Sequence, residues 1–188
     1  MIYIGTSGWQ YRHWLGRFYP SKPRVPDALA FYAGRFATVE LDSTFYRLPA
    51  VRTFAGWAPR TPDDFVFSMK ASRYLTHIRR LRDAHDPVDL MLSRAAGLGA
   101  KLGPVLLQLP PQMRRDDARL EAALREFDGR ARVAVEFRHA SWFADGVRRI
   151  LEAHAAALCL ADSGSRLVTP VWRTAGWGSP RRSRARSS

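Results

Sequence analysis

The sequence predicts an α/β protein of the TIM (β/α)8-barrel type, with about six of the eight strand-plus-helix units encoded. Six apolar or alternating segments read as strands, and segments with helical periodicity separate them. Successive strands begin about thirty residues apart, which is the length of one strand and one helix. Polar residues gather at the strand ends, and no dinucleotide fingerprint or P-loop follows the first strand. Both observations favour the barrel over an open doubly wound sheet.

The expected strands are recognised by their alternation. They cover residues 2–4, 38–42, 65–70, 103–111, 133–138 and 157–162. In the second, third and fifth, apolar side chains face one way and polar ones the other, because side chains along a strand alternate with period two. The fourth is apolar almost throughout, which suits a parallel strand covered on both faces.

The expected helices follow capping and turn signals. They cover residues 26–36, 53–58, 86–98, 116–127 and 144–155. Asp86 stands before Pro87 at the start of one helix, and Asp116 opens another that Gly129 closes. The Arg-rich segment 71–86 lacks clear periodicity. We therefore expect a long loop there, which is either a binding loop or a solvated connection.

Composition limits the class of protein. The 188-residue chain carries a formal charge of +13, which suggests a polyanionic partner. Only three of its 30 basic residues are lysine, however, so the arginine bias of a GC-rich gene is a competing explanation of the charge. No apolar run approaches the roughly 18 residues of a membrane span, and we expect a cytoplasmic protein with no membrane partner. The single Cys159 excludes an internal disulfide.

Several motifs together resemble the YecE-like family, a TIM-barrel domain of unknown function. The matching segments are Ile4-Gly5-Thr6-Ser7-Gly8-Trp9, Val39-Glu40-Leu41-Asp42-Ser43-Thr44-Phe45-Tyr46, Phe67-Ser68-Met69-Lys70 with Thr76-His77, Gly103-Pro104-Val105-Leu106-Leu107-Gln108-Leu109-Pro110-Pro111, Val135-Glu136-Phe137-Arg138-His139 with Ser141-Trp142, and Ala161-Asp162. They run in family order through most of the chain. The resemblance implies the barrel fold and the location of a site, but no established reaction.

The end of the chain departs from the expected family pattern. After Trp172-Arg173-Thr174 two further strands are expected, whereas the sequence passes into an Arg/Ser-rich stretch. We interpret residues 1–175 as an incomplete βα-barrel domain, truncated or frameshifted after about residue 175. Residues 176–188 are then a disordered basic tail, and the alternative is a natural basic tail.

The candidate site is the set of polar side chains at the carboxyl ends of the strands, where active sites of this architecture lie. The expected catalytic residues are Glu136, Lys70, Glu40 and Asp162, and the expected substrate-binding residues are Arg138, His139, His77, Asp42, Gln108, Trp9 and Trp142. A carboxylate beside a cation suits acid–base chemistry, while lysine and arginine suit a phosphate or carboxylate group. The competing interpretation is a structural network of ion pairs, with the tryptophans serving as core.

The sequence is compatible with more than one function, with or without a bound metal. The carboxylates form a ligand set that Mg²⁺ or Mn²⁺ accepts, but no fixed-spacing metal motif is present, so no metal site is assigned. Three functions are compatible with the residues. They are an enzyme, such as a hydrolase, lyase or isomerase, acting on a small polar or phosphorylated compound; a nucleic-acid-binding or nucleic-acid-processing protein using the Arg-rich loop; and a non-catalytic binding module.

Overall fold

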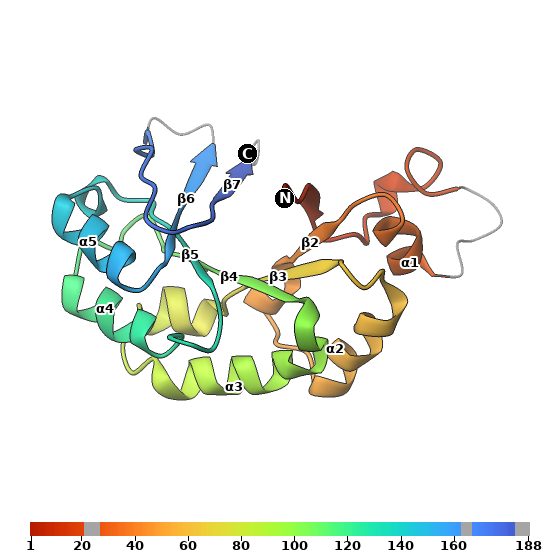
Figure 1. Cartoon of the computed structure of the whole chain (residues 1–188), viewed down its shortest axis with the longest axis horizontal. Coiled ribbons are helices and arrows are strands. Elements are labelled where there is room, and N and C mark those ends of the chain that lie inside the picture. Colours follow the sequence, from red (N-terminus) through yellow and green to blue (C-terminus); the bar gives the residue numbers. More distant parts are fainter. Residues whose placement is uncertain (21–26, 163–166, 183–188) are drawn as a thin grey trace. The chain divides into compact units, whose positions relative to one another are not determined.

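The computed structural model describes residues 1–20, 27–162 and 167–182 (Figure 1). The chain divides into two compact units. The first comprises Met1–Lys70 and Met91–Gly103, and the second comprises Ala71–Leu90 and Pro104–Ser188. Each unit contains parallel strands and the helices that cover them, so each is described by itself.

The first unit contains β1 (Gly5–Ser7), β2 (Thr38–Leu41) and β3 (Val66–Lys70), which pair in parallel in that order. The alternation of apolar and polar residues in the sequence determines which side chains of β2 and β3 face the core. Val39, Leu41, Phe67 and Met69 are buried, whereas Glu40 is only partly buried. This burial places the polar members of β2 on the face opposite the apolar core.

The first strand lies later in the chain than the sequence pattern predicts. The apolar segment 2–4 is not a strand, and Ile2 is 87% exposed. Pairing instead begins at Gly5, which lies opposite Thr38 of β2. A Cβ on Gly5 would approach the Thr38 carbonyl oxygen to 1.9 Å, so only glycine permits this close approach. Contact between backbones, rather than apolar character, therefore decides where β1 starts.

Helices α1 (Ala28–Ala33) and α2 (Val51–Trp57) belong to the same unit. Tyr32 of α1 is fully buried, and its hydroxyl accepts a hydrogen bond from the Thr6 backbone N–H of β1 at 2.8 Å. α2 packs against the 3-10 helix Ala96–Lys101. The ammonium group of Lys101 donates to the backbone carbonyls of Ala58 and Thr61, each at 2.7 Å, which anchors that helix.

Asp27 makes the stability of the first unit depend on acid pH. Its carboxylate caps α1 by accepting from the Ala30 N–H at 3.0 Å and pairs with the Arg60 guanidinium through two hydrogen bonds. The hydrogen bonds from Arg60 lower the pKa of Asp27 from 3.8 to about 2. The stabilisation is therefore complete above about pH 4 and is lost as pH falls towards 2.

We expect Asp27→Asn to flatten this acid dependence, because asparagine still caps the helix but cannot titrate. In the unaltered protein, acid pH lowers the free energy of unfolding through Asp27 by at most about 1 kcal/mol, because the Asp27–Arg60 pair is partly exposed to solvent. Urea denaturation of both proteins at about pH 3 and about pH 5 measures it. An unchanged pH dependence in the variant would show that Asp27 is not the titrating group.

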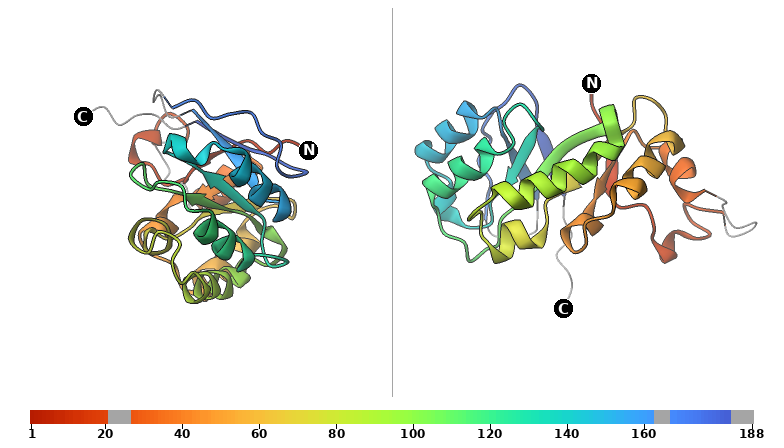
Figure 2. Two further views of the ribbon diagram at one scale, coloured as in Figure 1. Left: turned by 90° about the vertical axis from the view of Figure 1, so that its left-hand side faces the viewer. Right: turned by 90° about the horizontal axis from the view of Figure 1, so that it is seen from below.

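The second unit contains β4 (Leu102–Gln108), β5 (Val133–Glu136), β6 (Ala157–Asp162) and β7 (Ser179–Arg182), which pair in parallel in that order. The first two residues of β4 belong to the first unit. All four residues of β5 are buried. Helices α4 (Asp117–Arg125) and α5 (Asp145–Ala153) pack against each other beside these strands (Figures 1 and 2). β5 thus has no solvent face, and its polar residue must find its partners inside.

Helix α3 (His85–Ala95) crosses the boundary between the two units along the chain. Its residues up to Leu90 belong to the second unit, and those from Met91 belong to the first. The segment before it, expected to be a loop, contains the π-helix Tyr74–Ile78. Arg80, Leu81 and Asp83 follow with positive φ angles, a conformation that is uncommon for residues other than glycine. A short π-helix and a left-handed turn leave no repeating pattern in the sequence.

The expectation of a closed eight-unit barrel is wrong for this chain. The strands of the described residues follow the order β1 to β7, and the order does not return from β7 to β1. A closed barrel requires every strand to pair on both sides. The fold is therefore α/β with an open parallel sheet. It has one strand more than the sequence predicts, because β7 lies in the expected tail and its Ser-Pro-Arg-Arg sequence lacks apolar alternation. Residues 183–188 of that tail lie outside the described part.

Candidate functional site

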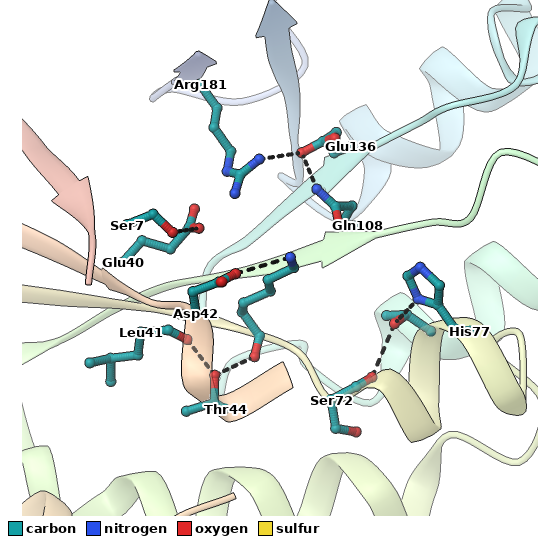
Figure 3. Close-up of polar contacts among 12 residues, drawn as sticks. Ser7, Glu40, Leu41, Asp42, Thr44, Ser72, His77, Gln108, Glu136 and Arg181 are labelled. Carbon is teal, nitrogen blue, oxygen red and sulfur yellow. Dashed lines mark hydrogen bonds and ion pairs between the residues drawn. The ribbon is translucent and has the colours of Figure 1, made fainter. Parts of the chain in front are cut away.

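The first unit places a buried cation at the end of β3. Lys70 is only 8% exposed, and its Nζ lies 3.0 Å from Asp42 Oδ1 (Figure 3). The same Nζ lies 4.5 Å from the centre of the Phe45 ring, at the distance of a cation–π contact. Thr44 donates a hydrogen bond to the Lys70 backbone carbonyl at 2.6 Å and fixes the strand end. The lysine is therefore held in one position.

Glu40 and Tyr11 lie near the same strand ends. Glu40 Oε1 accepts a hydrogen bond from the Ser7 hydroxyl of β1 at 3.0 Å, as Figure 3 shows. The Tyr11 hydroxyl donates to the Ser7 backbone carbonyl. Burial raises the pKa of Tyr11, and the negative charges of Asp42 and Glu40 raise it further. The phenol is therefore protonated at neutral pH and serves as a hydrogen-bond donor.

The second unit buries a carboxylate at the end of β5. Glu136 is 1% exposed, and both of its oxygens have donors. Figure 3 shows its contacts with Gln108 and Arg181. Oε1 accepts from Arg138 Nε at 2.8 Å, and Oε2 accepts from Gln108 Nε2 at 2.9 Å. Arg181 Nη1 lies 3.5 Å from Oε2, which is long for a hydrogen bond but close enough for an ion pair. Burial without such partners would cost several kcal/mol.

Two arginines share one carboxylate in this cluster. The guanidinium groups of Arg138 and Arg181 both pair with Glu136. Arg138 is a third exposed, and among the described residues its side chain pairs with Glu136 Oε1 alone. Its terminal amino groups can therefore donate to a ligand. Guanidinium groups bind phosphate and carboxylate with two parallel hydrogen bonds.

His139 follows directly and has a defined tautomer. Its Nδ1 accepts a hydrogen bond from the Ser141 backbone N–H at 3.1 Å, so that nitrogen carries no proton. The Ser141 hydroxyl lies 2.8 Å from the same atom and accepts from the Arg115 backbone N–H at 2.9 Å, which directs its own proton to His139. Neutral His139 is therefore protonated on Nε2 and presents a donor there.

His77 has the opposite arrangement, in the π-helix of the same unit. The Thr76 hydroxyl donates to the Ser72 backbone carbonyl at 3.0 Å, which uses its only proton. His77 Nδ1 lies 2.9 Å from that hydroxyl and must be the donor in this contact (Figure 3). In the neutral ring Nε2 is then an acceptor.

Three expected site residues have other environments. Trp9 is buried and packs edge to face against Trp57 at 5.2 Å, and Trp142 is fully buried. Asp162 is exposed at the end of β6 and pairs with Arg182 of β7 at 3.5 Å. These surroundings are those of core aromatics and of a surface ion pair. Binding and catalytic roles for the three remain predictions.

The remaining expected residues fall into groups within each unit. Lys70 joins Asp42 in the first unit, and Gln108, Glu136 and Arg138 join one another in the second. In the described part of the chain, no three His, Cys, Asp or Glu side chains gather as metal ligands would. Within the same residues, no helix is long and apolar enough to cross a membrane.

Sequence reasoning missed several members of these groups. Arg181 lies in a segment whose composition resembles a tail, and no periodicity marks it as a strand residue. Ser141 and Phe45 lie in two of the family motifs, three or more residues beyond the ends of β5 and β2. Ser141 and Phe45 could have been identified from their positions in the segments that follow β5 and β2.

The fold and the paired ionic groups identify the class of protein. The chain is an α/β protein with parallel strands whose carboxyl ends carry buried, paired ionic groups. The family model described as "Protein of unknown function DUF72" matches residues 3–187. The chain belongs to the DUF72 family, and its resemblance to the YecE-like proteins is confirmed.

Two curated relatives carry this resemblance. The UPF0759 protein YecE of Escherichia coli strain K12 is 33% identical over 147 residues, covering 78% of this chain and 52% of that protein. The UPF0759 protein YunF of Bacillus subtilis strain 168 is 32% identical over 151 residues, covering 76% of this chain and 52% of that protein. The chain thus spans about half the length of the curated relatives it matches.

Two solved structures share the fold. A DUF72 family protein from Thermotoga maritima MSB8 superposes with a TM-score of 0.77 at 26% identity, covering 97% of this chain and 74% of that one. A DUF72 family protein from Enterococcus faecalis V583 superposes with a TM-score of 0.74 at 21% identity, covering 92% of this chain and 66% of that one. The family description assigns no reaction.

Proposed function

We propose that the protein recognises a small anionic compound, through a phosphate or carboxylate group bound at the carboxyl end of β5 in the second unit. The observation that carries the proposal is the buried Glu136 carboxylate, which is held between Arg138 and Arg181. A ligand's anionic group takes the donors of Arg138 that point away from Glu136. The Nε2–H of His139, the next residue, adds a neutral donor.

In this proposal Glu136 positions the arginine rather than acting as the acid or base. Both of its oxygens already accept hydrogen bonds from Gln108 and Arg138, so moving a proton onto it would first break a buried contact. A carboxylate that fixes a guanidinium in one orientation reduces the side-chain entropy that a ligand must remove on binding. Recognition of an anion is therefore better supported than proton transfer by this residue.

We expect Arg138→Gln to weaken binding of inorganic phosphate about tenfold or more, since one charge-assisted hydrogen bond contributes about 1.5–3 kcal/mol. Isothermal titration calorimetry with phosphate and with acetate, at constant ionic strength, measures this effect and compares the two anions. Arg148→Gln is the matched control. It makes the same change on α5, where Arg148 pairs with Glu152 at the surface.

The control separates a site from general attraction to a basic protein. If the two variants lose phosphate affinity equally, binding is only a consequence of the charge of +13 and the proposal fails. Absence of measurable binding to either anion by the unaltered protein also contradicts it. Retention of the far-ultraviolet circular dichroism spectrum in both variants establishes that the fold is intact.

A further inference from the structure

We propose that Lys70 of the first unit is a reactive amine that condenses with a small aldehyde or ketone to form an imine, with Asp42 transferring the proton. This activity is separate from anion recognition at β5, and neither proposal depends on the other. Four observations support it. They are the presence of lysine rather than arginine, the burial of its side chain, the small number of its hydrogen-bond partners, and the partial exposure of the Asp42 carboxylate beside it.

The residue type is the first observation. Only three of the 30 basic residues in the chain are lysine, so this protein uses arginine almost wherever a positive charge suffices. An ion pair with Asp42 alone would be served as well by a guanidinium, which pairs with carboxylates in a fixed geometry. Lysine differs in that its amine can lose a proton and become a nucleophile. A lysine at position 70 therefore calls for an explanation beyond charge.

Lys101, in the same unit, is a lysine with a structural role. Its ammonium group donates to three acceptors, two backbone carbonyls and the Thr61 hydroxyl, which matches its three N–H bonds. Among the described residues, the ammonium group of Lys70 has one oxygen partner, Asp42, and the Phe45 ring. Within the described ranges, the Lys70 ammonium therefore has N–H bonds without an oxygen acceptor, unlike that of Lys101, and is less completely compensated for its lost hydration.

Access to the amine comes from the side of the carboxylate. Lys70 is 8% exposed, but the Asp42 side chain beside it is 39% exposed. A small carbonyl compound can therefore reach the pair past Asp42, while the stem of the lysine stays fixed by burial. Holding the amine in one place favours attack on a bound carbonyl carbon.

The reaction balances with the groups present. Asp42 takes one proton from the ammonium, and the free amine adds to the carbonyl carbon while the C=O π electrons move to oxygen. Asp42 returns its proton to that oxygen, the amine's second proton follows, and water leaves as the C=N bond forms. Ammonium plus carbonyl compound thus gives iminium plus water. The iminium keeps the single positive charge, so the contacts with Asp42 and Phe45 persist in the product.

Reductive trapping tests this proposal directly. The full chain is incubated at neutral pH with glycolaldehyde, or with glyoxylate, in the presence of sodium cyanoborohydride, and chymotryptic peptides are quantified by mass spectrometry. We expect about tenfold more adduct on Lys70 than on Lys101, although Lys70 is the more buried of the two. Equal or lower labelling of Lys70 in the folded protein overturns the proposal. The denatured protein, in which the lysines become equivalent, is the reference.

Asp42→Asn tests the proton transfer. Asparagine keeps a hydrogen-bond acceptor beside Lys70 but cannot carry the proton, so we expect labelling of Lys70 to fall about tenfold. Asp27→Asn is the control, because it makes the same change at the exposed ion pair with Arg60 in the same unit. Equal labelling of Lys70 in both variants removes the role of Asp42. Trapping on the unaltered protein does not depend on whether either variant folds.

Discussion

Glu136→Ala is expected to lower the free energy of unfolding by about 3–5 kcal/mol, the range found when one partner of a buried ion pair is removed. The carboxylate is 1% exposed, and its loss removes the negative charge with which both Arg138 and Arg181 pair. The Gln108 amide loses its acceptor as well. Guanidinium chloride denaturation followed by fluorescence measures the change.

Glu152→Ala is the matched control for that measurement. Glu152 also accepts from an arginine Nε, that of Arg148, at the same distance of 2.8 Å, but its side chain is 40% exposed. We expect a loss below about 1 kcal/mol, because water replaces the lost contact. The two substitutions differ chiefly in burial. If they destabilise the protein equally, Glu136 is hydrated in solution and does not hold the arginine pair.

Trp142→Ala is expected to cost about 3–5 kcal/mol, as is usual for a large aromatic residue removed from a core. Trp142 is fully buried, and its ring stacks on Phe137 with a centroid separation of 4.8 Å. Its indole N–H donates to the Met113 backbone carbonyl at 2.7 Å. Thermal unfolding followed by circular dichroism records the loss as a lowered Tm.

Two further variants separate packing from hydrogen bonding. Trp142→Phe keeps an aromatic ring but leaves the Met113 carbonyl without its donor, so we expect an intermediate loss of about 1–3 kcal/mol. Trp172, which is only partly buried, is the control, and Trp172→Ala should cost less than Trp142→Ala. An unchanged Tm for Trp142→Ala would contradict its burial and favour the substrate-binding role that the sequence alone suggests.

Much of the fold could be predicted from the sequence because it depends on local patterns. The alternation in 38–42 and 65–70 correctly identifies β2 and β3, and the apolar segment 157–162 coincides with β6. Asp116 is the N-cap of α4 in the structure, with its side chain accepting from the Arg119 N–H. These signals work because they depend on neighbouring residues along the chain.

The candidate site could be predicted less completely. The sequence predicts that Glu136 and Arg138 lie together, because residues two apart on a strand point the same way. The two side chains do form a hydrogen bond, although β5 ends at Glu136 and Arg138 lies beyond it. The sequence prediction also includes Gln108 as a polar residue near a strand end, and the structure places Gln108 opposite Glu136 in the parallel pairing of β4 and β5. The sequence does not reveal Arg181, whose strand forms only by adding to the edge of β6.

The α/β class, most strand and helix positions, and the family follow from the sequence alone, because short-range periodicity and the YecE-like motifs carry that information. The three-dimensional structure was needed to establish that the sheet is open and that β1 starts at Gly5. It was also needed to show that Trp142 is buried in the core. Each of these depends on contacts between residues far apart in the chain. Such contacts are set by pairing and packing, and leave no pattern along the sequence.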